Sequence, residues 1–217
     1  MNSILHHPDP LPTVLRQSPA NGLRRRQRIG EYRIDHDALR HFNMLLQRLH
    51  LRQAPLECDQ VASAARELVD RSREGQAPRC IQQRMRRAAA INVMAEDPDW
   101  EVAYAAALRA ELVVIDYLRG GFDLIPRTVR VVGRLDDAIL VDAAWPSLAA
   151  EVRDYVAFRR LRQVEAMLRG ENRTHFGFTR KQYQDAALAE AAWIAHCERV
   201  DQLSYLPRDA TLAFRIH

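Results

Sequence analysis

The sequence predicts an all-α protein, a compact bundle of about six to seven helices. Apolar residues make up 47% of the 217 residues, which is enough for a sizeable core. Apolar side chains recur every three to four residues over successive long stretches, as they do along one face of an α-helix. Proline and glycine residues separate these stretches, as helix ends require.

The first half of the chain contains three predicted helices, at about residues 35–51, 57–74 and 79–96. Asp35 and Asp37 lie at the start of the first, where the helix dipole favours negative charge. Apolar residues repeat at helical spacing in all three. Their predicted core positions are Leu39, Phe42, Leu46, Leu49, Val61, Ala65, Leu68, Ile81, Met85, Ala88 and Ile91.

The second half contains three more predicted helices, at about residues 98–119, 135–169 and 179–200. Pro98 suits the first position of the fourth helix, because its missing N–H would be unpaired there anyway. Pro146 predicts a kink or break near residues 144–146. Thr179 and Gln182 have the spacing of a capping box. The predicted inward stripe of the fourth helix consists of Ala105, Leu108, Leu112 and Ile115.

The predicted domain organisation has three parts. Residues 1–28 are expected to be a flexible tail rich in proline and arginine. Residues 29–169 form the helical domain, and residues 170–217 a helical extension packed on it. Weak alternation predicts short strands near 30–34 and 212–216, and a minor two-stranded pairing of these would join the chain's ends.

Composition narrows the class of protein. Thirty-two Lys and Arg against 28 Asp and Glu give a net charge of +4, which permits an anionic partner without demanding one. The three cysteines form no Cys-x-x-Cys pair, so we expect a reducing, cytoplasmic location. No stretch approaches the roughly 18 apolar residues of a membrane span, and the N-terminus lacks the apolar core of a signal peptide.

One connector carries the most specific motif. It consists of Asp123, Leu124, Ile125 and Pro126, followed by Gly133, Leu135, Asp136 and Asp137. This pattern resembles the YkvA-like family, a bacterial domain of unknown function with an Asp-Leu-Ile-Pro step, a glycine and a Leu-Asp-Asp-Ala helix start. The resemblance covers about residues 30–168. It implies a helical fold and no established activity, and Arg127 stands where members usually carry an acid.

The connector has two interpretations. In the structural one, which we favour, Leu124 and Ile125 fill the gap between helices, Pro126 and Gly133 shape the turn, and the acids bond the backbone. In the functional one, Asp123, Asp136 and Asp137 bind a hard cation such as Mg²⁺ in a metal-dependent enzyme. Adjacent Asp136 and Asp137 point about 100° apart on a helix, which argues against a shared ion.

Three arginine clusters form another candidate surface, for nucleic acid or an anionic membrane. They are Arg24, Arg25 and Arg26; Arg84, Arg86 and Arg87; and Arg159 and Arg160. No aromatic residues interleave with them, as single-strand binding prefers, so nucleic acid is not the favoured partner.

The chain contains no recognisable catalytic triad, phosphate loop or helical zinc motif. We therefore expect a non-enzymatic protein-interaction module without a cofactor, which binds an unknown protein partner or forms a homo-oligomer.

Overall fold

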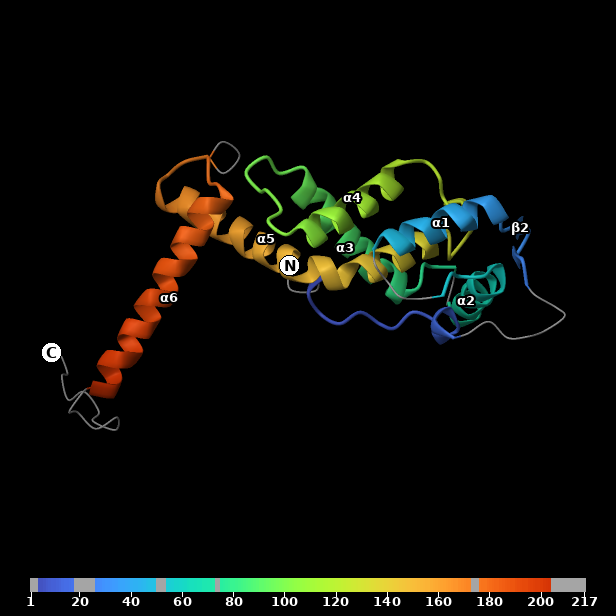
Figure 1. The fold of residues 1–217 in the computed structure, drawn as a ribbon, viewed down its shortest axis with the longest axis horizontal. Coiled ribbons are helices and arrows are strands. Elements are labelled where there is room, and N and C mark those ends of the chain that lie inside the picture. The colour runs from blue at the N-terminus through green and yellow to red at the C-terminus, as the bar shows by residue number, and fades with distance from the viewer. Residues whose placement is uncertain (1–3, 18–25, 50–53, 73–74, 173–175, 204–217) are drawn as a thin grey trace. The chain divides into compact units, whose positions relative to one another are not determined.

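The computed structural model describes residues 4–17, 26–49, 54–72, 75–172 and 176–203 (Figure 1). Six α-helices occur in these ranges, and the strands form one small two-stranded sheet, so the predicted all-α class is confirmed. Contacts divide the chain into two compact units, Met1–Ala157 and Phe158–His217.

A short hairpin opens the helical part of the first unit. Strand β1 (Arg28–Ile29) pairs antiparallel with β2 (Tyr32–Arg33). Gly30, with φ of 60°, allows the tight turn between them. The strand expected near 30–34 therefore pairs within the hairpin. The expected partner near 212–216 lies outside the described residues.

Helices α1 (His36–Arg48), α2 (Cys58–Arg71) and α3 (Arg79–Ala95) follow the predicted pattern. The Asp35 side chain accepts a hydrogen bond from the Ala38 N–H at 2.9 Å and so caps α1. The buried core includes the predicted residues Leu39, Phe42, Val61, Ala65, Leu68, Ile81, Ala88 and Ile91. These three helices therefore contribute buried apolar side chains to the core of the first unit.

Helix α4 (Ala105–Arg119) begins later than Pro98, where we expected it to start. The Asp97 side chain accepts from the Asp99 N–H at 3.2 Å, and the Trp100 N–H donates to the Asp97 carbonyl at 3.1 Å. These local bonds compete with a helical turn. Trp100 is buried, so this irregular segment is anchored in the core.

The predicted inward stripe of α4 is wrong. Leu108 and Leu112 are exposed, at 43% and 60%, while Val113, Val114 and Tyr117 are buried. The inward face of the helix also carries two buried polar side chains, Glu111 and Tyr117, and the Tyr117 hydroxyl donates to Asp136.

Helix α5 (Leu135–Leu168) continues through Pro146, so of the kink or break expected there the break does not occur. Pro146 is exposed and has no N–H, so the Asp142 carbonyl four residues earlier lacks its helical donor. At the C-terminus, the Glu171 N–H donates to the Ala166 carbonyl at 2.9 Å and Gly170 has φ of 68°. This Schellman motif ends the helix at the predicted glycine.

Of the predicted flexible tail at residues 1–28, residues 1–3 and 18–25 lie outside the described residues, whereas residues 4–17 are packed against the fold. Residues 4–17, which we call the N-terminal strap, lie against the helices of the first unit and end in the 3-10 helix η2 (Thr13–Arg16) (Figure 1). Leu11 and Leu15 belong to the buried core. Proline disfavours helix but suits this extended course, and burial of the leucines then holds the segment in place.

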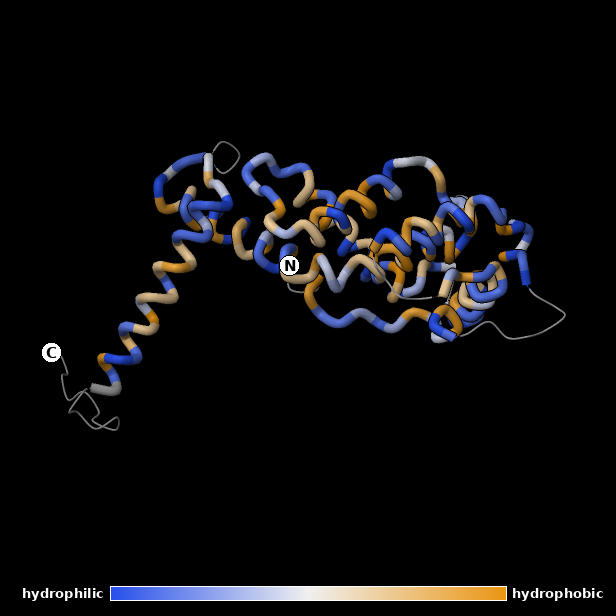
Figure 2. Tube along the Cα trace, viewed as in Figure 1, coloured by the Kyte–Doolittle hydropathy of each residue, from blue (hydrophilic) through white to orange (hydrophobic). Residues whose placement is uncertain are grey.

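The second unit combines the end of α5 with helix α6 (Arg180–Leu203). The rings of Phe158 and Phe178 stack at 5.7 Å, and Tyr183 meets Phe158 edge-on at 6.1 Å. The Thr179 N–H donates to the Gln182 side chain at 2.7 Å, as the predicted capping box requires. Apolar residues recur along the whole of α6 (Figure 2).

Candidate functional site

The connector between α4 and α5 makes an unusual pair of turns. Val131 has φ of 71°, and the Val132 N–H donates to the Arg130 carbonyl at 2.8 Å, which closes a γ-turn. A β-branched residue rarely adopts positive φ. A Cβ on Gly133 would lie 2.7 Å from the Val129 carbonyl oxygen, so this close passage requires glycine.

The apolar residues of the motif fill the space between helices, as the structural interpretation predicted. Leu124, Ile125 and Leu135 are fully buried. The Pro126 carbonyl accepts from the Val129 N–H at 2.9 Å and so begins the turn toward α5.

Asp136 holds the connector's main chain. Its Oδ2 accepts from the Tyr117 hydroxyl at 2.6 Å and from the Ile125 N–H at 3.0 Å. The Tyr117 hydroxyl accepts from the Leu124 N–H, and the Tyr32 hydroxyl donates to the Leu124 carbonyl. Burial raises the pKa of Tyr117, with the charge of Asp136 adding to the effect, so this hydroxyl stays a donor. Side chains from β2, α4 and α5 therefore hold the main chain of Leu124 and Ile125 in place.

Asp123 and Asp137 lack such partners. The Oδ1 atom of each is buried without a hydrogen-bond partner, while Asp123 Oδ2 lies 3.4 Å from Arg127 Nε. Among the described residues, no group of three His, Cys, Asp or Glu side chains is arranged to hold a metal ion. The alternative interpretation, in which Asp123, Asp136 and Asp137 bind one cation, gains no support from this arrangement, because Asp136 is turned toward Tyr117 and Ile125.

Burial, together with the charge of Asp136, raises the pKa of Asp137 from 3.8 to about 7. Between about pH 4 and pH 7 the Asp137 carboxyl is therefore protonated in the folded protein and ionised in the unfolded chain. The free energy of unfolding falls as the pH rises through this range. We expect Asp137→Asn to raise the free energy of unfolding at pH 8 by about 2 kcal/mol and to leave it nearly unchanged at pH 4. Urea denaturation at both pH values measures this, and equal effects at the two would contradict it.

A second acidic cluster was missed by the sequence analysis. Trp100 Nε1 donates to Glu151 Oε1 at 3.1 Å, and both side chains are buried. Burial, and secondarily the negative charge of Glu151, raises the pKa of Glu111. Tyr155 donates to Asp97 at 2.9 Å beside it. The presence of Trp100 beside acidic residues in the sequence could have indicated this cluster. Through Trp100 and Asp97, the cluster holds the turn before α4 to α5.

The three arginine clusters differ in how far their described side chains are buried. Arg84 and Arg87 are buried, whereas Arg86 between them is exposed. The Arg26 N–H donates to Asp59, and its guanidinium donates to Ser63. Arg160 is exposed and Arg159 half-buried, both in the second unit. The remaining cluster members, Arg24 and Arg25, lie outside the described residues.

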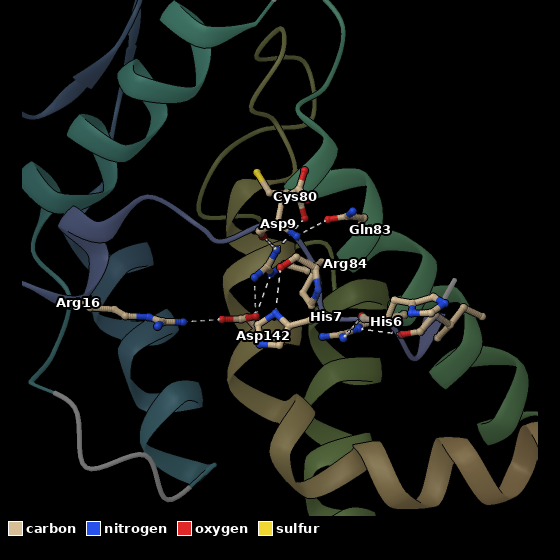
Figure 3. A network of polar contacts seen from close by, with 11 residues as sticks. His6, His7, Asp9, Arg16, Cys80, Gln83, Arg84 and Asp142 are labelled. Carbon is tan, nitrogen blue, oxygen red and sulfur yellow. Dashed lines mark hydrogen bonds and ion pairs between the residues drawn. The ribbon is translucent and has the colours of Figure 1, made fainter. Parts of the chain in front are cut away.

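Arg84 is instead the centre of a polar network beneath the strap (Figure 3). It is 2% exposed, and its Nε and Nη2 donate to Asp142 Oδ1 on α5 at 3.0 and 2.7 Å. Its Nη1 donates to the carbonyls of Asp9 in the strap and Cys80 in α3. One guanidinium therefore joins three parts of the first unit.

Arg87 holds the beginning of the strap. It donates from Nε to the Ile4 carbonyl at 3.2 Å and from Nη2 to the His6 carbonyl at 3.0 Å. Its guanidinium lies over the Trp145 ring, 3.9 Å from the centroid. Burial lowers the pKa of Arg87, and the nearby charge of Arg84 lowers it further. Such buried cations require hydrogen-bond acceptors, which the strap supplies.

Comparison with protein families, curated proteins and solved structures finds no match to this chain. The YkvA-like resemblance therefore stays a prediction from the connector motif. No helix in the described ranges has a stretch that is both long and apolar enough for a bilayer crossing.

Proposed function

We propose that the protein is a non-enzymatic interaction module that binds a second copy of itself through α6. One observation carries this proposal: Trp193, Ile194 and Val200 are half or more exposed on a single helix. Large apolar side chains grouped on a helix face are typical of protein-binding surfaces.

The exposed residues continue a face that is already packed. At about 100° per residue, one stripe runs along the helix. It consists of Ala186, Ala189, Trp193, Cys197 and Val200, with Tyr183 and Ile194 at its edge. Tyr183 packs against Phe158 within the second unit, and the stripe then extends beyond that contact. A partner helix packed on this stripe would continue the apolar contact that Tyr183 makes with Phe158.

The first unit offers a matching surface. Tyr104, Leu108 and Leu112 are spaced four residues apart around α4, and all three are exposed. A second copy could place its α6 on this α4 stripe and receive the same contact in return, as two-fold symmetry requires.

Other features support the same proposal. Cys58 and Cys80 are buried free thiols, which accords with the proposed cytoplasmic location. Asp136, one of the three carboxylates in the metal-dependent interpretation, is occupied with hydrogen bonds from Tyr117 and the Ile125 N–H. Membership of the YkvA-like family and a bacterial origin belong to the proposal as well.

Sedimentation of the full chain over a concentration series tests this function. We expect a monomer–dimer equilibrium, which Trp193→Glu weakens about 100-fold because a charge enters the centre of the interface. Leu112→Glu on α4 is expected to weaken it similarly.

The control is Gln184→Glu, which adds the same charge to the opposite side of α6 and should leave association unchanged. A wild-type chain that stays monomeric throughout the series, or variants that all associate equally, would contradict self-association through α6.

A further inference from the structure

The strap is held by its main chain, independently of the α6 surface. Arg84 and Arg87 donate to strap carbonyls, and the Asp9 N–H donates to Gln83 Oε1 at 2.7 Å. At the other end, Gln60 Nε2 donates to the Gln17 carbonyl at 2.7 Å. Main-chain recognition selects a backbone conformation, here an extended segment followed by the 3-10 helix η2, and leaves the side-chain sequence largely open.

Side-chain selection rests on a few apolar positions. Pro8, Leu11, Pro12 and Leu15 are buried, while Pro10 between them is exposed. Pro12 has φ of −49° and ψ of 132°, close to a polyproline conformation. This backbone is largely preorganised, so little conformational entropy is lost on binding.

The strap does not fill its groove. A cavity of about 260 Å³ lies between it and the helices, lined in part by Leu11, Leu15, Leu46, Ile139 and Pro146. Larger side chains at the two leucine positions would bury more apolar surface there. A peptide with larger side chains at these positions would therefore bury more apolar surface in the groove than the strap does.

The groove is also built for an occupant. Asp142 pairs with Arg84, whereas the Arg87 guanidinium has the strap carbonyls and the Trp145 ring as partners. Removal of the strap would leave two neighbouring buried cations with fewer acceptors, an unfavourable state. A second chain that presents carbonyls at the same points would again supply the acceptors that Arg84 and Arg87 need.

We propose that this groove binds extended, proline-containing segments of other proteins, and that residues 4–17 are its built-in ligand. Covalent attachment gives the strap a high effective concentration, so a competing segment must bind more tightly than the strap. The chemistry required is a backbone that is extended through Pro12 and then makes one 3-10 turn, with proline or branched apolar residues at the spacing of Pro8, Leu11 and Leu15.

A labelled synthetic peptide of residues 4–17 tests the proposal by fluorescence anisotropy. The receptor is the full chain carrying Leu11→Asp and Leu15→Asp, which weaken its own strap. We expect saturable binding, at least about tenfold tighter than to the wild-type chain. A peptide with Leu15→Phe should bind several-fold tighter still, because the ring enters the cavity.

Two arginine variants of that receptor separate the groove from general charge. Arg87→Lys keeps the charge but loses the planar fork, so we expect about a tenfold loss of affinity. Arg86→Lys, at the exposed neighbour, should have no effect. Equal binding by both variants, or by a peptide carrying Leu11→Asp and Leu15→Asp, would overturn the proposal.

If the weakened receptor does not fold, a wild-type chain cut at a protease site between Ala20 and Asn21 replaces it. The cut strap should stay bound and be exchanged by labelled peptide. A strap that leaves and cannot be replaced by excess peptide would overturn the proposal. Dimers that survive Trp193→Glu but dissociate on adding peptide would show that copies exchange straps, which again requires a groove open to a second chain.

Discussion

Replacing Arg84 with Met is expected to lower the free energy of unfolding by about 3 kcal/mol. The methionine fills similar space but removes both hydrogen bonds to Asp142, whose side chain is only 24% exposed. The carbonyls of Asp9 and Cys80 lose a donor at the same time. Arg16, 3.5 Å from the other Asp142 oxygen and itself exposed, compensates little. Urea denaturation at neutral pH measures the loss.

Arg86→Met is the matched control, since it is the same substitution on the same helix at an exposed position. Its effect should stay within about 0.5 kcal/mol. If both variants lose equal stability, the network around Arg84 contributes nothing specific. Asp142→Asn should reproduce part of the Arg84→Met effect, because an amide keeps one acceptor for the guanidinium but loses the charge.

The role of Arg84 shows what a one-dimensional pattern misses. Arg84 lies three residues after Ile81 and four before Ala88, on the same buried face of α3. Its position in the apolar stripe was therefore readable from the sequence. The cluster of Arg84, Arg86 and Arg87 indicated an exposed surface instead. The acceptors that permit the burial of Arg84 come from the strap and α5, more than 50 residues away in the sequence, so the pattern along α3 could not reveal them.

Helix α4 illustrates a different ambiguity. Apolar residues lie on two of its faces, so spacing alone could not decide between Leu112 and Val113 as core residues. The polar residues decide it, since Glu111 lies in the buried cluster with Glu151 and Tyr117 bonds Asp136. A pattern that places polar residues outside fails where such residues are paired inside.

The connector was predicted better, because its determinants are local. A glycine at a tight passage and an acid in a helix's first turn act over a few residues. What could not be predicted is that Asp136 bonds Tyr117 and Ile125, while Asp137 is buried beside it without a hydrogen bond to its Oδ1. That difference depends on how α4 approaches α5.

Gly133→Ala is expected to lower the free energy of unfolding by about 3 kcal/mol, the upper part of the range for overpacking. The new Cβ would lie 2.7, 2.8 and 2.9 Å from the carbonyl oxygens of Val129, Arg127 and Pro126. All three are main-chain atoms, so no side-chain rotation can relieve the contact. The γ-turn at Val131 must shift with them, which disturbs the entry into α5. Thermal and urea denaturation of the full chain measure the effect.

Gly177→Ala separates this contact from the general effect of a methyl group. A Cβ there meets nothing within 4 Å and its φ is not in the left-handed region, so we expect a change below about 0.5 kcal/mol. Equal stability of the Gly133→Ala and Gly177→Ala chains would mean that the connector can move away from the new methyl group. The bonds from Tyr117 and Ile125 to Asp136 oppose such a movement, because they hold the α4 side of the turn to α5.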